Sequence, residues 1–209
     1  MPTGVALRDV RAQLFGAADR ILLRDGPSGL TTRTITAEAG VATGVLHRHF
    51  TDFDDFLAQH ILDRIDQLDS QAAALREAAG TGTVVGNLAD ALSALFSSVA
   101  VAVVALITFR DELRARLRLA LPAGVPVLTE AVAMTAAYLT AERERGRIAP
   151  GADVDALAPT LIGAAHLLFA DRTGTPPDDD AVRRMVTAVL AGVLRGPDRH
   201  PWLQPSRRR

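Results

Sequence analysis

Apolar side chains recur at helical spacing along most of the chain, with polar residues filling the positions between them. The pattern begins with Val10, Leu14 and Ile21 and stops at Gly26-Pro27. Two shorter helices are predicted from Thr31 to Gly40 and from Thr43 to His49, because each threonine hydroxyl can cap the free amides of a first turn. No alternating run long enough for a strand occurs, so the pattern predicts an all-α fold.

A long amphipathic helix is predicted to follow Phe50. Asp52 can cap it, and Asp54 and Asp55 lie in its first turn, where the helix dipole favours carboxylates. Breaks rich in Gly and Pro divide the remainder into helices near 84–107, 109–120, 126–145, 154–172 and 179–195. Three short helices thus precede six longer ones. We expect an N-terminal domain at 1–51, a second helical domain at 52–196 and a flexible tail at 197–209.

Composition and charge exclude several classes of protein. The chain has no cysteine, which excludes disulfides and thiolate metal sites and fits a reducing compartment. A formal net charge of −1 excludes a polybasic protein, although residues 1–50 are mildly basic and the rest mildly acidic. The first residues lack a signal peptide. The uncharged stretch from Ala91 to Phe109 has the length of a membrane span, but its serines and flanking charges favour a buried core helix. We expect a cytoplasmic protein without a membrane partner.

Residues 31–50 have the physical features of a helix-turn-helix. Ile35 and Ala39 face the core, and Gly40 supplies a residue that tolerates the positive φ of a tight turn. Leu46 and Phe50 anchor the second helix, which leaves the polar residues between them facing outward. Helices of this kind lay their N-terminal residues along base edges in the major groove. The segment therefore predicts binding to double-stranded DNA.

The segment TTRTITAEAGVATGVLHRHF resembles the helix-turn-helix of the TetR family of transcriptional regulators. The positions that match the family pattern are Thr31, Ile35, Ala39, Gly40, Val41, Gly44, Leu46, His49 and Phe50. The resemblance implies a three-helix DNA-binding domain followed by a six-helix ligand-binding and dimerisation domain. Together with the outward-facing positions, it predicts DNA contacts from Thr31, Thr32, Arg33, Ala42, Thr43, Gly44, Val45, His47, Arg48 and His49.

Four residues depart from the family pattern. Ala42 and Val45 stand where hydroxyl residues are common, and His47 stands where the family usually has a tyrosine that touches a phosphate. Phe53 replaces a frequent lysine at the start of the fourth helix. Ala42, Val45 and Phe53 lack groups that bond DNA in the family, whereas a histidine at position 47 can bond a phosphate as tyrosine does. We therefore expect DNA affinity either to be lower than is typical of the family or to rest more on Arg33, Arg48, Thr31 and Thr43.

The last two predicted helices are apolar over wide faces, which favours a dimer interface. Its expected residues are Leu157, Leu161, Ala165, Leu168, Val182, Val186, Val189 and Val193. The resemblance implies a homodimer that presents two helix-turn-helix motifs to a palindrome whose half-sites lie about 34 Å apart. A cavity for a small, largely apolar effector is expected among the middle helices, with the candidate residues Phe96, Phe109, Met134, Tyr138, His166 and Phe169.

The sequence gives little indication of metal binding, dinucleotide binding or catalysis. His47 and His49 point about 200° apart on a helix, so they cannot bind one metal ion together. The glycines from Gly80 to Gly86 follow a helix, whereas a dinucleotide-binding loop follows a strand. We expect no catalytic residue, metal or cofactor, and a protein that is not an enzyme. The favoured hypothesis is a repressor released from a palindromic operator by a small molecule. The alternative is a helical small-molecule-binding protein with a weak or vestigial DNA-binding head.

Overall fold

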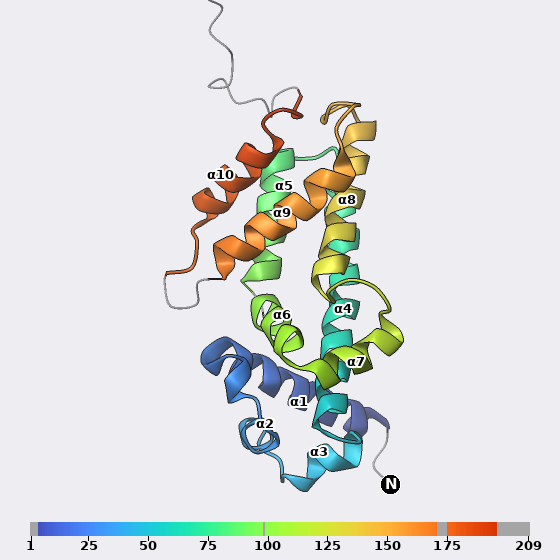
Figure 1. The fold of residues 1–209 in the computed structure, drawn as a ribbon, viewed down its shortest axis with the longest axis vertical. Helices are drawn as coiled ribbons and strands as arrows, with labels where there is room; N and C mark the ends of the chain where they lie inside the picture. The colour runs from blue at the N-terminus through green and yellow to red at the C-terminus, as the bar shows by residue number, and fades with distance from the viewer. Residues whose placement is uncertain (1–3, 98, 171–174, 196–209) are drawn as a thin grey trace, which may run out of the picture. The chain divides into compact units, whose positions relative to one another are not determined.

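The computed structural model describes residues 4–97, 99–170 and 175–195 (Figure 1). Every regular element in this part of the chain is helical, so the predicted all-α class is confirmed. In chain order the elements are α1 (Gly4–Asp25), the 3₁₀ helix η1 (Pro27–Gly29), α2 (Thr32–Glu38), α3 (Gly44–His49), α4 (Phe53–Glu77), α5 (Val84–Phe96), α6 (Ala100–Phe109), α7 (Asp111–Ala120), α8 (Leu128–Glu144), α9 (Val154–Phe169) and α10 (Asp179–Leu190).

The contacts between residues divide the chain into two compact units. The first unit comprises residues 1–66 and 98–128, and the second comprises residues 67–97 and 129–209. The long helix α4 runs from the first unit into the second, whereas α6 and α7 belong to the first unit although they follow α5. The functional boundary expected between residues 51 and 52 stays a prediction.

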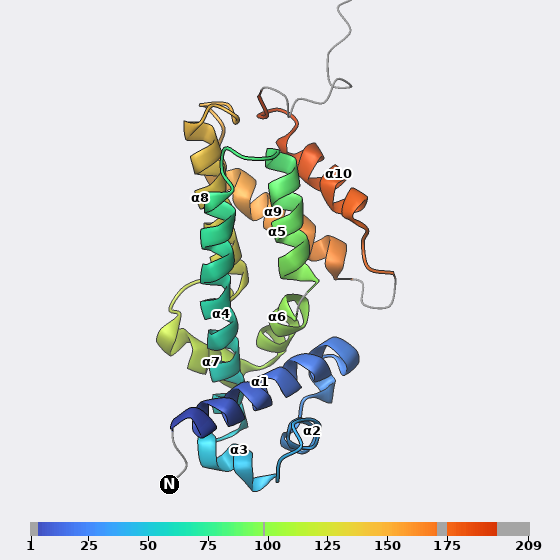
Figure 2. The same ribbon diagram turned by 180° about the vertical axis from the view of Figure 1, so that it is seen from behind.

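In the first unit, α1 packs against α2, η1 and α6. Figure 2 shows α1 lying between α2 and α6. Leu14, Ile21 and Leu22 of α1 are fully buried, as is Leu57 of α4, because the apolar stripes of these helices turn toward each other. This core fixes the surface from which α2 and α3 project.

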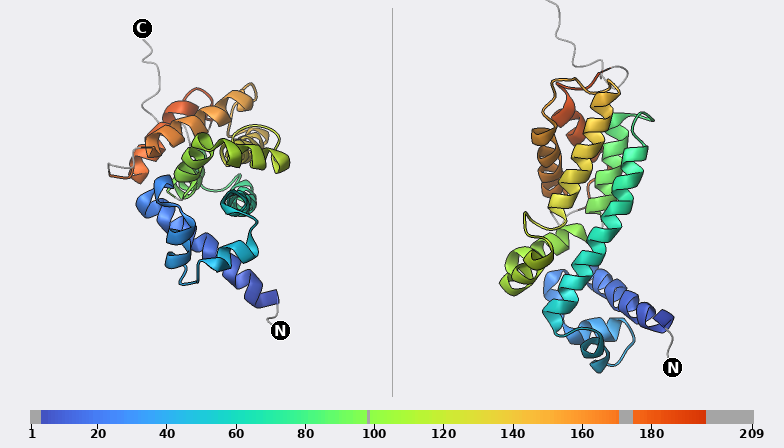
Figure 3. Two further views of the ribbon diagram at one scale, coloured as in Figure 1. Left: turned by 60° about the horizontal axis from the view of Figure 1, so that its bottom comes forward. Right: turned by 90° about the vertical axis from the view of Figure 1, so that its right-hand side faces the viewer.

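In the second unit, α10 packs against both α5 and α9, and α5 also packs against α9. Figure 3 shows α8 running alongside the second part of α4. The chain after α10 pairs with the turn after α8. There the Ala149 amide donates to the Val193 carbonyl at 2.8 Å, and the Arg195 amide donates to the Arg147 carbonyl at 2.8 Å.

The predicted helix caps are mostly confirmed. As predicted, the side chains of Thr31 and Asp52 accept hydrogen bonds from backbone amides in the first turns of α2 and α4. Asp178, for which no cap was predicted, does the same for α10. Thr43 is the exception, because its backbone is already helical and its side chain makes no capping bond. The capping role predicted for Thr43 is therefore wrong.

Two predicted helices differ from the structure. The helix expected at 84–107 is interrupted between Phe96 and Ala100, near Ser97, a residue type that favours helix ends because its hydroxyl competes for backbone groups. Seven helices rather than six therefore follow α3 in the described residues. The last helix ends at Leu190 instead of residue 195, because the backbone of residues 193–195 bonds the turn after α8. The predicted tail at 197–209 lies outside the described residues.

Within the described residues, no single helix is long and apolar enough to cross a membrane. Helices α5 and α6 meet the criteria of length and hydropathy only when they are joined across the bend between them.

Candidate nucleic-acid interface

A reciprocal pair of threonines starts α2. The Thr31 hydroxyl accepts a hydrogen bond from the Thr34 amide at 3.1 Å, and the Thr34 hydroxyl accepts one from the Thr31 amide at 2.9 Å. This arrangement is a capping box in which threonine takes the place of the usual glutamate. It satisfies two backbone amides that would otherwise lack partners.

The turn after α2 depends on Gly40. Its φ of 68° lies in the left-handed region, which a residue with a Cβ adopts only at a cost. The Val41 amide bonds the Thr36 carbonyl at 2.9 Å and the Gly40 amide bonds the Ala37 carbonyl at 3.1 Å, the two bonds of a Schellman motif. Gln13 of α1 donates to the carbonyl of Ala39 at 2.9 Å, which ties this turn to α1.

An aromatic cluster packs against the end of α3. Leu46 is fully buried, and the Phe50 ring lies 5.9 Å from Phe15 and 5.0 Å from Phe56, measured between ring centroids. The guanidinium of Arg11 lies over the Phe50 ring at 4.9 Å. Leu46 and Phe50 therefore anchor α3 as the sequence predicts.

The ten predicted DNA contacts lie on α2, α3 and the residues just before each helix. Three of them are partly buried, namely Thr32, Val45 and His49, and the other seven are exposed. The hydroxyl oxygen of Thr31 accepts the capping hydrogen bond from the Thr34 amide, whereas the Thr43 hydroxyl makes no capping bond. No atom of the protein lies within 4 Å of the place where a Cβ on Gly44 would stand. We call the exposed residues Arg33, Thr43, Gly44, His47 and Arg48 the reading face.

The basic side chains of the reading face have no side-chain partner among the residues that the structure describes. In the part of the chain that the structure describes, Arg33, His47 and Arg48 make no side-chain hydrogen bond or ion pair. Most other arginines of the first unit are engaged. Arg20 and Arg24, for example, both donate to Glu38 and hold the pKa of its carboxyl below the ordinary value. The acid nearest to the reading face on α2 is thus already neutralised.

The acids at the start of α4 are neutralised as well. Arg116 of α7 binds both oxygens of Asp52 at 2.9 Å each, and its hydrogen bonds lower the pKa of Asp52. Arg110 binds one oxygen of Asp54 at 2.7 Å. Burial raises the pKa of Asp55, but hydrogen bonds from Gln59 and Thr51 outweigh this effect and leave it lowered.

Sequence reasoning missed these two arginines, because their partners lie 56 and 64 positions earlier in the chain. The neighbouring Arg114, by contrast, pairs with Asp111 of its own helix.

The predicted effector residues divide between the two units. Phe96 lies 5.9 Å from His166 and 6.0 Å from Phe169, measured between ring centroids, and Met134 and Tyr138 are buried in the same unit. Phe109 belongs to the first unit and is 86% exposed, so it does not join them. The Tyr138 hydroxyl accepts from Asn87 at 3.0 Å and bonds Glu142, and burial raises the Tyr138 pKa.

Two polar atoms in the second unit are buried without a partner among the described residues. They are the hydroxyl oxygen of Thr135 and Nδ1 of His166. Buried polar atoms are normally bonded, so each could serve a ligand. Sequence analysis proposed His166 but missed Thr135, since one threonine within an apolar helix carries no distinguishing signal.

Half of the predicted dimer residues are turned toward the interior of the chain. Leu161, Ala165, Val182 and Val186 are buried in the core of the second unit. The other four, Leu157, Leu168, Val189 and Val193, are partly exposed. The outward face of α9 instead carries Leu167, which is 77% exposed, and Gly163, beside which a Cβ would meet no atom.

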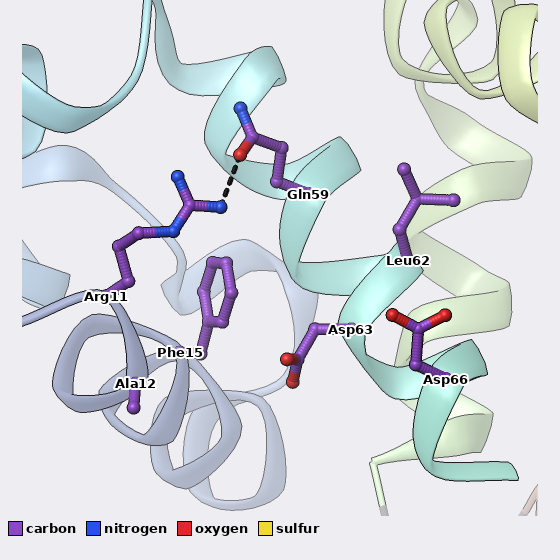
Figure 4. A pocket seen from close by; sticks show the side chains of 7 residues that line it. All are labelled: Arg11, Ala12, Phe15, Gln59, Leu62, Asp63 and Asp66. Carbon is purple, nitrogen blue, oxygen red and sulfur yellow. Dashed lines mark hydrogen bonds between the residues drawn. The ribbon is translucent and has the colours of Figure 1, made fainter. Parts of the chain in front are cut away.

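A cavity of about 450 Å³ opens between α1 and α4 in the first unit (Figure 4). Its lining combines apolar and charged side chains, and Arg11 bonds Gln59 at one end. The residues are Arg11, Ala12, Phe15, Gln59, Leu62, Asp63 and Asp66. None of them is among the predicted effector residues.

Comparisons with known proteins agree with this geometry. Residues 14–59 match the N-terminal model of the family described as bacterial regulatory proteins, tetR family. The match extends from α1 into α4 and includes the whole reading face. The chain matches none of the curated proteins with which it was compared.

Solved structures share the fold over most of their length. A putative TetR-family transcriptional regulator from Mesorhizobium loti is 19% identical with a TM-score of 0.65, and the alignment covers 88% of this chain and 95% of that one. FadR from Bacillus subtilis in complex with stearoyl-CoA is 18% identical with a TM-score of 0.61, covering 87% and 98%. A gamma-butyrolactone receptor described as ArpA-like is 19% identical with a TM-score of 0.64, covering 94% of each chain.

Proposed function

We propose that the chain is a DNA-binding transcription regulator of the TetR family, whose N-terminal model matches residues 14–59, and that it acts as a repressor released from a palindromic operator by a small effector. Repression, the palindrome and the release are parts of this proposal.

The observation that carries the proposal is the uncompensated charge of the reading face. Arg33, His47 and Arg48 are exposed and unpaired in the described residues, while the acids Glu38 of α2 and Asp52 and Asp54 at the start of α4 are bound by arginines. Such a surface suits the phosphates and base edges of the major groove, where arginine pairs with guanine in bidentate fashion. Ala42 and Val45 offer apolar contacts that suit the thymine methyl group.

A homodimer would present two reading faces to one palindrome. The burial of Leu161, Ala165, Val182 and Val186 leads us to place the dimer interface on the outward faces of α9 and α10. Leu167 supplies exposed apolar surface there, and Gly163 permits the close approach of a second helix.

For the effector we propose a small, largely apolar molecule held in the second unit near Phe96, His166 and Phe169. The unpartnered atoms of Thr135 and His166 would bond its polar groups. The similarity to proteins named for stearoyl-CoA and gamma-butyrolactone binding is compatible with this class of ligand. Release requires that the ligand bind one conformation of the dimer more tightly than the other by a few kcal/mol.

The alternative function is small-molecule binding with a vestigial DNA-binding head. It is favoured by the absence of hydroxyls at Ala42 and Val45 and by Phe53, whose ring packs on Phe56 at 6.1 Å between centroids. Tight ligand binding without any selection of DNA would support this alternative.

The first test selects operator sequences with the full chain. Purified protein is incubated with a library of random duplexes, and we expect the bound fraction to become enriched in a palindrome. Arg48→Ala should bind that palindrome about 10- to 100-fold more weakly, because an arginine–base contact contributes about 1–3 kcal/mol. Arg114→Ala removes a charge from α7 without touching the reading face, so it serves as the control. Failure of the wild-type chain to enrich any sequence would exclude the proposal.

Gly44 offers a second prediction that separates folding from binding. Gly44→Ala should keep or slightly raise the stability of the chain, since alanine favours helix by about 1 kcal/mol over glycine and its Cβ meets no protein atom. The same Cβ should weaken binding to the selected operator if a phosphate or base comes close to Gly44. Gly40→Ala, compared by urea unfolding, should lose stability because of its positive φ. Equal operator affinity of wild type and Gly44→Ala would show that DNA does not approach this glycine.

A further inference from the structure

Three carboxylates follow the helix that bears the reading face. Asp52, Asp54 and Asp55 all lie within six residues of His49, the last residue of α3. Three residues of chain span at most about 11 Å, so Asp52 lies about one Debye length or less from that helix end at 0.1 M salt. Without compensation these acids would repel the phosphates that α3 approaches.

Two arginines from a distant part of the sequence meet these acids. Arg116 forms a bidentate pair with Asp52, with both N–O distances at 2.9 Å. Arg110 binds Asp54 through two nitrogens at 2.7 and 3.2 Å, and its guanidinium lies 5.5 Å from the centre of the Phe53 ring. The two arginines therefore attach α7 and its N-cap residue, Arg110, to the N-terminus of α4.

The Asp52 side chain has two roles at once. One oxygen, Oδ1, accepts the Asp55 amide at 2.7 Å and so caps α4, while both oxygens bind Arg116. The carboxyl group remains 48% exposed at the side-chain level, so its charge would be felt outside the protein without the arginine. The pair therefore holds the helix start and cancels a charge in the same place.

We propose that Arg110 and Arg116 are positioning residues for DNA binding, which neutralise Asp54 and Asp52 and fix the first turn of α4 so that α3 meets DNA phosphates without repulsion. The inference rests on the proposed DNA-binding function. It also gives α7 a role in regulation. A displacement of α7 that separates these pairs would leave Asp52 and Asp54 charged, and their repulsion of the phosphates would weaken DNA binding.

The test is a double-mutant cycle on the full chain with the selected operator duplex. Arg116→Gln leaves Asp52 charged and should weaken binding about fivefold at low salt, because one added charge about 10 Å from several phosphates costs about 1 kcal/mol in total. The loss should shrink as salt rises and screens the repulsion. Arg116→Gln combined with Asp52→Asn should restore wild-type affinity, since asparagine removes the charge and still caps the helix. Arg114→Gln is the matched control for the loss of one arginine from α7.

Arg110→Gln with Asp54→Asn repeats the cycle at a position that is not the helix cap, and it decides the question if Arg116→Gln does not fold. The inference is supported if adding the Asp→Asn change to each arginine variant restores operator affinity. It is overturned if Arg116→Gln and Arg110→Gln bind the operator as tightly as the control variant Arg114→Gln. A loss that persists at high salt and is not restored by asparagine would also overturn it, since this result indicates only a fold-supporting role. Absence of operator binding by the wild-type chain would overturn both the proposed function and this inference.

Discussion

Replacing Phe50 with alanine should destabilise the chain by about 3–5 kcal/mol, as expected when a buried phenylalanine leaves a cavity. Phe50 is 3% exposed and touches Phe15, Phe56 and the guanidinium of Arg11. It is also the C-cap residue that directly follows α3, so its loss frees the C-terminal end of the reading face. Urea unfolding followed by circular dichroism measures the change in the free energy of unfolding.

The neighbouring Phe53 provides the control for this prediction. Phe53 is partly exposed and stacks on Phe56 without reaching beneath α3, so Phe53→Ala should cost less stability than Phe50→Ala. Operator affinity should fall further for Phe50→Ala than its unfolded fraction explains. If the two variants lose equal stability, the cluster does not hold α3 in the way we describe.

Replacing Arg147 with methionine should have an effect of similar size in the second unit. Glu142 is fully buried, and Arg147 donates to both of its carboxyl oxygens and also to the carbonyl of Gly82 at 2.8 Å. Removing one partner of a buried pair leaves an uncompensated charge and typically costs about 3–5 kcal/mol. Thermal or urea unfolding of the variant measures this loss, and Arg145→Met, at an exposed arginine, is the control.

The pH dependence of stability tests whether the loss in Arg147→Met comes from the buried charge of Glu142. Burial raises the Glu142 pKa, but hydrogen bonds from Arg147, Tyr138 and the Gly80 amide outweigh it, so the folded-state pKa is lowered. A lowered pKa contributes stability above the unfolded-state value of about 4.3, and this contribution is lost as the pH falls through the folded-state value. Without Arg147 burial dominates, so the deficit of Arg147→Met should narrow as the pH falls from 7 toward 4. A deficit independent of pH, or one that Glu142→Gln does not reduce, would argue against an ionic cause.

The helix-turn-helix was predictable because its signals are local. A capping threonine at Thr31, a glycine at Gly40 and apolar anchors at Leu46 and Phe50 each act within a few residues, and the structure places all of them as expected. Gly44 could also be identified from the sequence, because it matches the family pattern four residues after Gly40. The capping role predicted for Thr43 was wrong, because a threonine before a helix can cap it or leave its hydroxyl without a capping bond, and the sequence is the same in both cases.

Features that depend on distant parts of the chain were not predictable. The pairs of Arg116 with Asp52 and Arg110 with Asp54 join residues 64 and 56 positions apart, and no periodicity points to them. Helix α9 is apolar on more than one side, so the pattern could not tell that Leu161 meets the core and Leu167 meets solvent. For the same reason Phe109, an aromatic residue at a helix end, resembled a pocket residue although it is 86% exposed.

The membership of α6 and α7 in the first unit bears on how such regulators can be recombined. A graft of residues 1–66 alone onto another scaffold would carry α2, α3, Asp52 and Asp54 but would leave out Arg110 and Arg116, which neutralise the two acids. The portable piece is discontinuous, consisting of residues 1–66 together with 98–128. A chimaera that exchanges both segments would transfer the proposed DNA-binding surface together with the two arginines that neutralise its neighbouring acids.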